Sequence, residues 1–222
     1  MPSIPFTEVV RFRREFPGLK TIKTGHDLIG RKGALAPVVR VPLETLSRRK
    51  NFRLLDIGAY DRALGKAIQR LGIQFEYRSV DPDQSCDHDF AQIEDADGEY
   101  DVIAAFELIE HLKYDDVVRL LHHAYQRLLP GGLLFLSTPH PYHPTRFVSD
   151  ASHVQHWPPH DLYAVLRHIG FESNDVQLYG VDYSGQWGAR AVVDSIRRSF
   201  WHCIGLEFRG GILAVARKSE QS

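Results

Sequence analysis

The amino-acid sequence predicts an α/β domain in which helices cover both faces of a mostly parallel sheet. Short apolar runs alternate with segments of helical apolar spacing from residue 52 to the end of the chain, and this alternation is typical of parallel sheets. The 222 residues, 43% of them apolar, suffice to bury a two-sided sheet. Because ligands of such sheets bind at the carboxyl ends of the strands, we look for functional residues there.

The predicted strands are short apolar runs bounded by polar residues or glycine. They comprise residues 52–58, 73–80, 100–107, 133–138, 171–179 and 210–218. The predicted helices combine an apolar stripe with a polar start or a glycine stop. The clearest begins at Asp115 and ends before Pro130, and others follow Asp61, precede Gly170 and cover residues 185–204.

The first 50 residues do not follow this alternation. Apolar residues around Val9 and Leu43 predict two short helices with a basic loop between them. We therefore expect residues 1–50 to form a helical cap or lid, and residues 51–222 to form the main domain.

Charge and cysteine content exclude several functional classes. Lys and Arg total 27 against 28 Asp and Glu, and this balance argues against nucleic acid as a partner, since phosphate neutralisation needs a basic surplus. Cys86 and Cys203 form no CxxC pair, which argues against a disulfide framework or a thiolate zinc site. The sequence shows neither a transmembrane segment nor an apolar signal-peptide core, so we expect a soluble, cytoplasmic protein.

Acidic residues follow the first two predicted strands at positions suited to a nucleoside. Asp56 stands two residues before Gly58, and Asp81 ends the next strand. An acid at this second position accepts hydrogen bonds from ribose hydroxyls. The pattern fits a dinucleotide or an adenosyl cofactor, and Asp56 is placed to attract a cation or an amino group.

Several segments, taken in order, resemble the class I S-adenosylmethionine-dependent methyltransferases over about residues 50–218, in particular their type 11 and type 23 groups. The segments are LLDIGAYDRALG (54–65), SVDPD (79–83), HDF (88–90), DGEYDVIAAFELIEHL (97–112), LLPGGLLFLSTPH (128–140) and HVQHWPPHDLYAVLRHIGFE (153–172). The resemblance implies a Rossmann-like, seven-stranded, mostly parallel sheet whose last strand is antiparallel. It makes residues 51–222 the methyltransferase domain.

The resemblance also implies S-adenosyl-L-methionine as cofactor. The residues that would bind it are Asp56, Gly58, Ala59, Tyr60, Asp81, Pro82, Asp89, Phe90 and Phe106. Asp81 would hold the ribose, and Asp89 with Phe90 the adenine. Tyr60 and Arg62 stand where the family has glycines, which let the backbone approach the cofactor. They narrow the pocket, alter the cofactor's pose or mark a binder without catalysis, and the sequence leaves these alternatives open.

The implied reaction is in-line methyl transfer, in which the protein aligns the acceptor and excludes water. We expect O-methylation of a small molecule, a glycan or a lipid-linked acceptor. Glu107, Glu110 and His111 share one face if a helical turn follows their strand. With His153 they can hold a divalent cation such as Mg²⁺, which lowers the pKa of a hydroxyl. The expected catalytic residues are His111, His153 and His156.

The E-x-x-E-H pattern at 107–111 resembles two subgroups, ubiquinone-type O-methyltransferases and small-RNA 2′-O-methyltransferases, and the net charge of −1 argues against the second. Structural roles remain open for the same residues: Asp56 as a turn cap, the acids of 107–110 at a helix start, and His153 and His156 packing against Trp157. Two alternative functions also remain. One is an NAD-dependent oxidoreductase, disfavoured because GxGxxG is absent, and the other is a catalytically inactive methyltransferase-like binding module.

Overall fold

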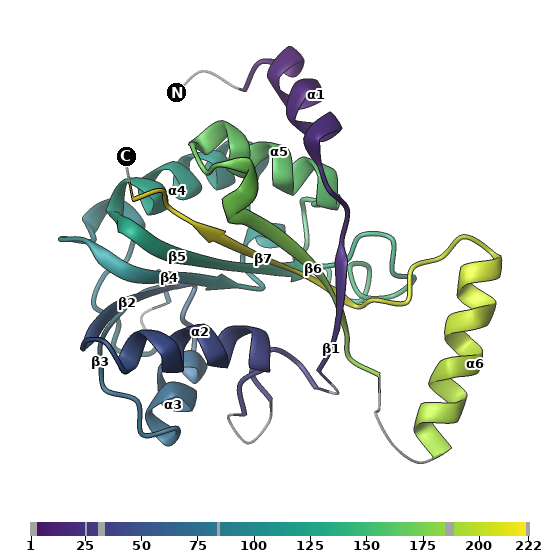
Figure 1. The fold of residues 1–222 in the computed structure, drawn as a ribbon, viewed down its shortest axis with the longest axis horizontal. Coiled ribbons are helices and arrows are strands. Elements are labelled where there is room, and N and C mark those ends of the chain that lie inside the picture. Colours follow the sequence, from purple (N-terminus) through teal and green to yellow (C-terminus); the bar gives the residue numbers. More distant parts are fainter. Residues whose placement is uncertain (1–3, 25, 31–33, 84, 185–188, 221–222) are drawn as a thin grey trace.

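The computed structural model describes residues 4–24, 26–30, 34–83, 85–184 and 189–220. Within them, seven strands form a single sheet (Figure 1). The strands are β1 (Lys20–Lys23), β2 (Phe52–Ile57), β3 (Phe75–Val80), β4 (Tyr100–Phe106), β5 (Leu128–Pro139), β6 (Val176–Asp182) and β7 (Gly211–Arg217). Their order across the sheet is β1-β6-β7-β5-β4-β2-β3.

The sheet is parallel except for β7, which runs antiparallel to both β5 and β6. The predicted mostly parallel, seven-stranded sheet with an antiparallel last strand is therefore confirmed. Register aligns the carboxyl ends of the central strands, since Asp56 of β2 lies opposite Ala104 of β4, and Phe106 opposite Ser137 of β5. Side chains that follow these strands consequently meet at one edge.

Helices cover both faces of the sheet, as predicted (Figure 1). They are α1 (Phe6–Glu15), α2 (Pro37–Ser47), α3 (Ala63–Arg70), α4 (Tyr114–Arg127), α5 (Pro159–Ile169) and α6 (Ala189–Cys203). One face carries α4 and α5, with α1 packed on α5, and the other carries α2 and α3. Helix α6 stands apart from the sheet, beyond the end of β6 (Figure 1).

Residues 1–50 contain the two expected helices, α1 around Val9 and α2 around Leu43, and also a strand that the sequence did not predict. Strand β1 pairs in parallel with β6, from Lys20 opposite Tyr179 onward, and forms an edge of the sheet. Its sequence, KTIK, has no apolar run, and only its isoleucine is partly buried. The edge position explains why polarity is tolerated there. A boundary at residue 50 stays a prediction.

Two element boundaries differ from the prediction. The strand expected over 171–179 begins only at Val176, because Ser173–Asp175 form a 3₁₀ turn. Strand β5 begins at Leu128, directly after α4, so the Pro-Gly-Gly expected to end the helix lies inside the strand. Residues 185–188 of the expected last helix lie outside the described residues. In the described residues, no helix is long and apolar enough to cross a membrane.

Candidate functional site

A glycine turn follows β2 and is fixed to the neighbouring strand. Gly58 has φ 70° and donates its N–H to Val80 O at 2.8 Å, and Ala59 N–H donates to the same carbonyl at 3.3 Å. A Cβ atom on Gly58 would lie 2.9 Å from Leu108 Cδ1. Both the left-handed backbone and the close packing therefore require glycine here.

Strained backbone is concentrated near this turn. Among the described residues, the non-glycine residues with positive φ are Tyr60 (42°), Arg62 (61°) and Glu107 (49°). Left-handed backbone costs about 1–2 kcal/mol for a residue with a Cβ. Tyr60 and Arg62 thus keep the backbone conformation that glycine would favour, although the glycines are absent. Strain of this kind clusters at functional sites.

The side chain of Arg62 helps to hold this conformation. Its Nη2 donates to Ser79 Oγ at 3.0 Å and to Asp89 Oδ2 at 3.1 Å. Asp89 also accepts from Arg78 Nη1 and from Ser79 N–H, each at 2.9 Å. Burial raises the pKa of Asp89, but these bonds outweigh it and hold the pKa below its usual range. Asp89, expected at the adenine, lies in an ion-paired network between β3 and Arg62.

Asp81 lies at the end of β3 and faces the glycine turn. Its Oδ2 accepts the Tyr60 N–H at 2.9 Å, and its Oδ1 accepts the Asp83 N–H at 2.9 Å, with Pro82 between. Phe90 lies alongside, because Asp81 N–H donates to its carbonyl at 3.0 Å. Each carboxylate oxygen has two acceptor sites, so Asp81 can still accept from a ribose.

Asp56 is the buried acid of the turn, with 4% of its surface exposed. Tyr77 Oη donates to its Oδ2 at 2.7 Å. Burial raises the pKa of Asp56 to about 7, against the opposing effects of Tyr77 and Arg62. Near neutral pH the carboxyl group is thus half ionised, and a cation placed beside it would draw it into the charged form.

Two cavities meet at Gly58, which lies in the wall of both. We call the first the donor cavity; it measures about 400 Å³ and is lined by Asp27, Leu28, Ile29, Asp56, Gly58, Ala59, Tyr60, Asp61, Ala63, Leu64, Phe106, Glu107, Ser137, Arg146 and Tyr183. The second, of about 380 Å³, lies on the side of Asp81 and Pro82 and includes Ile93 and Leu108. Together they form a hollow that crosses the turn along the carboxyl edge.

Glu107 closes the donor cavity at the end of β4, next to Phe106. Its strained backbone is held by Ser137, whose carbonyl accepts the Glu107 N–H at 3.1 Å and whose Oγ donates to Glu107 Oε1 at 2.7 Å. Burial raises the pKa of Glu107, although the Ser137 bond acts in the opposite direction.

Glu110, His111 and His153 form a separate group, in which one donor atom from each lies within 4.8 Å of the others. The Glu110 carboxylate is fully buried, and neither oxygen has a partner of ordinary hydrogen-bond geometry in the described part of the chain. Burial and the nearby Glu107 raise the pKa of Glu110 to about 8. His153 Nδ1 lies 2.8 Å from Phe147 O, so the proton is on Nδ1 and Nε2, which lies 3.9 Å from Asp150 Oδ2, is the ring atom that can act as a ligand.

Two residues expected near this group have other contacts. Glu107 is absent from the group of donor atoms and is bonded to Ser137. His156 stacks on the Phe147 ring, with centroids 3.7 Å apart and an interplanar angle of 22°. Trp157, expected to contact these histidines, packs instead on Tyr114 and donates Nε1–H to Ile109 O at 3.1 Å.

Sequence reasoning missed several residues of the donor cavity. Asp27 and Leu28 come from the segment before α2, and Arg146 and Tyr183 come from segments after β5 and β6. None of these residues carries a motif. The one available signal was the Gly210-Gly211 pair, since a Cβ on Gly210 would lie 2.7 Å from Tyr183 Cδ2 and 2.9 Å from Arg146 Nε.

A protein-family model described as a methyltransferase domain matches residues 30–176, more than half of the chain. No curated protein matches the chain. Among solved structures, an S-adenosylmethionine-dependent methyltransferase from Archaeoglobus fulgidus superposes with a TM-score of 0.61 at 20% identity, over 82% of this chain and 93% of that one.

Two further structures share the fold. One, from Clostridium acetobutylicum and named as an S-adenosylmethionine-dependent methyltransferase, has a TM-score of 0.52 at 11% identity, over 81% of this chain and 89% of that one. The other, Haemonchus contortus phosphoethanolamine N-methyltransferase 2 in complex with S-adenosyl-L-methionine, has a TM-score of 0.53 at 13% identity, over 96% of this chain and 53% of that one. The chain therefore belongs to the methyltransferase-domain family and has the fold of S-adenosylmethionine-dependent methyltransferases.

Proposed function

We propose that this protein transfers a methyl group to an oxygen of a small-molecule, glycan or lipid-linked acceptor. The observation that carries the proposal is the hollow across Gly58, around which Tyr60, Arg62 and Glu107 keep left-handed backbone at an energetic cost. The matching family model describes a methyltransferase domain, which favours methyl transfer over the oxidoreductase alternative.

The chemistry of the walls of the hollow across Gly58 suits S-adenosylmethionine. Asp81 would accept the ribose hydroxyls, and buried Asp56 would face the amino group of the methionine part. The cavity that includes Pro82, Ile93 and Leu108 would take the adenine. When bound, the cofactor supplies an electrophilic methyl group on a sulfonium.

A hydroxyl acceptor must lose its proton as the new bond forms, so the residues around the cleft need a proton acceptor. Glu107 opens onto the donor cavity, and burial raises its pKa, so its carboxylate is a stronger proton acceptor than an exposed one. We also keep His111, His153 and His156 as proposed catalytic residues, since a neutral imidazole has a ring nitrogen that can accept a proton. Ser137 would fix the Glu107 carboxylate for this role.

Glu110, His111 and His153 fit a divalent cation, because neither oxygen of the buried Glu110 carboxylate has a partner of ordinary hydrogen-bond geometry among the described residues. Two imidazoles and a carboxylate suit first-row divalent metals, and a carboxylate alone suits Mg²⁺. A bound cation would lower the pKa of an acceptor hydroxyl. Glu107 remains a weaker candidate for a fourth ligand of the cation.

The proposed cofactor site is tested by isothermal titration calorimetry with S-adenosylhomocysteine. We expect saturable binding by the wild type and about tenfold weaker binding by Asp81→Ala, since a charge-assisted hydrogen bond is lost. The control is Asp115→Ala, an acid at the start of α4 away from the cleft. Absence of binding at millimolar ligand, with the protein folded, would contradict the proposal.

The metal proposal has its own readout. Elemental analysis of protein purified without chelator should show a divalent ion, and Glu110→Gln should remove it while the protein stays folded. If no ion is found and added Mg²⁺ or Mn²⁺ leaves the thermal unfolding temperature unchanged, the group has a structural role. Cofactor binding without methyl transfer to a broad set of hydroxyl acceptors would favour the inactive binding module.

A further inference from the structure

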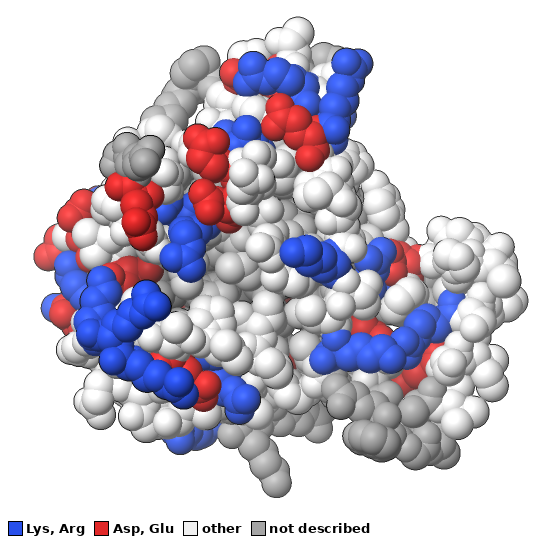
Figure 2. All heavy atoms as spheres, viewed as in Figure 1, with Lys and Arg blue, Asp and Glu red and all other residues white. Residues whose placement is uncertain are grey.

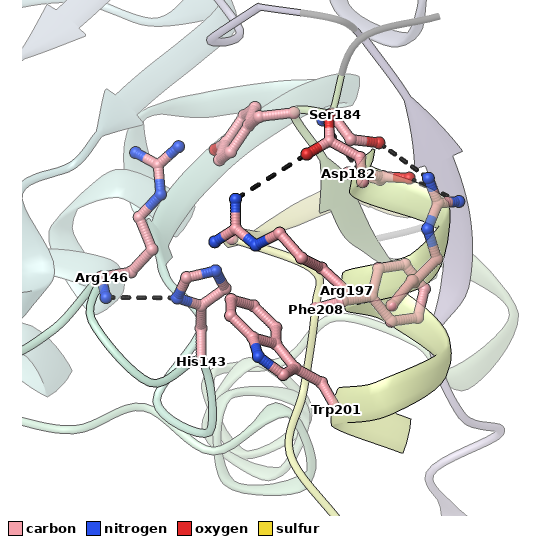
Figure 3. A pocket seen from close by; sticks show the side chains of 11 residues that line it. His143, Arg146, Asp182, Ser184, Arg197, Trp201 and Phe208 are labelled. Carbon is pink, nitrogen blue, oxygen red and sulfur yellow. Dashed lines mark hydrogen bonds and ion pairs between the residues drawn. The ribbon is translucent and has the colours of Figure 1, made fainter. Parts of the chain in front are cut away.

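A third cavity, of about 270 Å³, lies beside the donor cavity. It is lined by the loop after β5, the end of β6, α6 and the residues before β7 (Figure 3). We call it the α6 cavity. Arg146 and Tyr183 line both this cavity and the donor cavity. The two spaces therefore adjoin, and a molecule in the α6 cavity can reach the donor cavity past these two side chains.

Two arginines of the α6 cavity have only loose contacts with protein groups. The Arg146 guanidinium lies 4.5 Å from the Tyr183 ring and 4.0 Å from Asp27, with no side-chain hydrogen bond to any described residue. Arg197 Nη1 lies 3.8 Å from Asp194, and its guanidinium is 4.9 Å from the Trp201 ring. Both keep donors that an anionic ligand could use.

Arg198, their neighbour on α6, differs in this respect. Its Nη1 lies 3.1 Å from Asp182 Oδ2, and its Nη2 donates to Ser184 Oγ at 2.9 Å. These bonds fasten α6 to the end of β6. Arg198 therefore serves to position the helix, while Arg197, one residue earlier, is left facing the cavity.

His143 lies between the positively charged side chains of Arg146 and Arg197. Burial, together with the charges of Arg146 and Arg197, lowers the pKa of His143 to about 4. Figure 3 shows the two arginines on either side of this ring. The neutral ring accepts backbone N–H groups of Arg146 and Thr145 at Nδ1, each at 3.3 Å. Its proton is then on Nε2, which adds a neutral donor to the two cationic ones.

The surroundings support a binding space. Figure 2 shows Lys and Arg side chains gathered along the seam between α6 and the rest of the molecule, with acidic side chains among them. Trp201 lies edge-on to His143, with centroids 5.1 Å apart, and offers an aromatic surface. Gly210 and Gly211 leave the room that Tyr183 occupies, because a Cβ on either residue would collide with that ring.

We propose that the α6 cavity binds the methyl acceptor through an oxyanion of that molecule, a carboxylate or a phosphate. Arg146 and Arg197 hold the oxyanion, and Trp201 packs against an aromatic or apolar part. Guanidinium groups bind such planar or tetrahedral oxyanions with paired hydrogen bonds. The proposal rests on the proposed function, because it places the acceptor next to the donor cavity through Arg146 and Tyr183.

The test uses three probes of similar size: phenyl phosphate, benzoate and uncharged benzyl alcohol. Binding to the full chain is measured by ligand-observed NMR titration. We expect at least one anion to bind about tenfold or more tightly than benzyl alcohol, and Arg197→Gln to weaken that anion about tenfold. Arg11→Gln, at an exposed arginine of α1 whose partner Glu8 is 3.9 Å away, should change nothing. The stronger anion identifies phosphate or carboxylate.

Equal binding of all three probes, or unchanged anion binding by folded Arg197→Gln, would overturn the proposal. A parallel titration with S-adenosylhomocysteine separates it from the proposed function. Arg197→Gln should keep its affinity for S-adenosylhomocysteine, while Asp81→Ala should bind S-adenosylhomocysteine about tenfold more weakly and bind the anion as the wild type does. If the chain binds the anion but never binds S-adenosylhomocysteine, the proposed function fails. The α6 cavity is then not an acceptor site, because its acceptor role rests on that function.

Discussion

The donor cavity and the α6 cavity adjoin, yet the chain builds them differently. Most of the donor cavity comes from residues that directly follow β2 and β4, within 56–64 and 106–107. The α6 cavity combines the loop after β5, the end of β6, α6 and the segment before β7. The donor cavity, proposed for the cofactor, therefore depends on residues at the ends of two strands. The α6 cavity, proposed for the acceptor, depends on how segments distant in the sequence pack together.

The largest expected effect on the donor side comes from Gly58→Ala. The new Cβ would lie 2.9 Å from Leu108 Cδ1 in left-handed backbone. Overpacking of this kind costs about 2 kcal/mol, so we expect about 30-fold weaker binding of S-adenosylhomocysteine by calorimetry. Phenyl phosphate binding should be unchanged, since Gly58 does not line the α6 cavity.

Gly72→Ala is the matched control for this change. Gly72 has φ 71°, nearly the value at Gly58, but nothing lies within 4 Å of its Cβ position. Both variants therefore carry the same backbone penalty of about 1–2 kcal/mol in unfolding free energy. Equal loss of cofactor affinity in both would mean that backbone strain alone, and not the wall at Gly58, explains the effect.

The next effect is the pH dependence caused by Asp56, whose pKa is raised to about 7. An ammonium group binds the ionised carboxylate, so the affinity of the wild type for S-adenosylhomocysteine should rise about tenfold from pH 6 to pH 8. Asp56→Asn should bind about tenfold more weakly at pH 8 and show no such rise. Parallel pH profiles for the two proteins would exclude Asp56 from contact with the amino group.

Ionisation of Asp56, which should raise the affinity for S-adenosylhomocysteine, should lower the free energy of unfolding. Because burial raises its pKa in the folded state from the ordinary 3.8 to about 7, the folded state binds the extra proton between about pH 4 and 7, and the unfolding free energy falls as pH rises through that window. Asp56→Asn removes this loss. By urea unfolding, its advantage over the wild type should therefore grow from pH 5 to pH 8, by at most ~3 kcal/mol.

The smallest expected effect is that of Tyr60→Gly. Tyr60 is 70% exposed and holds φ 42°, so glycine relieves strain and removes little packing. We expect a gain of up to ~1 kcal/mol in unfolding free energy after the cost of a more flexible unfolded chain. Affinity for S-adenosylhomocysteine should stay within about threefold. A tenfold gain would instead show that Tyr60 narrows the pocket.

Much of the fold could be predicted because apolar periodicity reports burial directly. The central strands β2 and β4 are mostly apolar and buried, and the acids Asp56 and Asp81 lie at the ends of neighbouring parallel strands. Strand β1 escaped prediction because an edge strand buries little and needs no apolar run. The left-handed backbone of Tyr60 and Arg62 was likewise unpredictable, since it depends on bonds from Asp81, Ser79 and Asp89.

The rest of the cleft could not be predicted because its residues come together only in three dimensions. Arg146 and Tyr183 are 37 positions apart in the sequence, and the Arg146 guanidinium lies over the Tyr183 ring, 4.5 Å from its centroid. Glu110, His111 and His153 were expected together and do lie together, whereas Glu107 does not join them. The difference arises from the backbone turn at Glu107, which directs its carboxylate to Ser137.

The central claim is that the hollow across Gly58 holds the methyl donor, and a crystal structure grown with saturating S-adenosylhomocysteine tests it most directly. The account predicts the ligand over Gly58, with its ribose hydroxyls on Asp81 and its sulfur in the donor cavity toward Arg146 and Tyr183. The ligand bound elsewhere, or a donor cavity empty at saturating concentration, would contradict it.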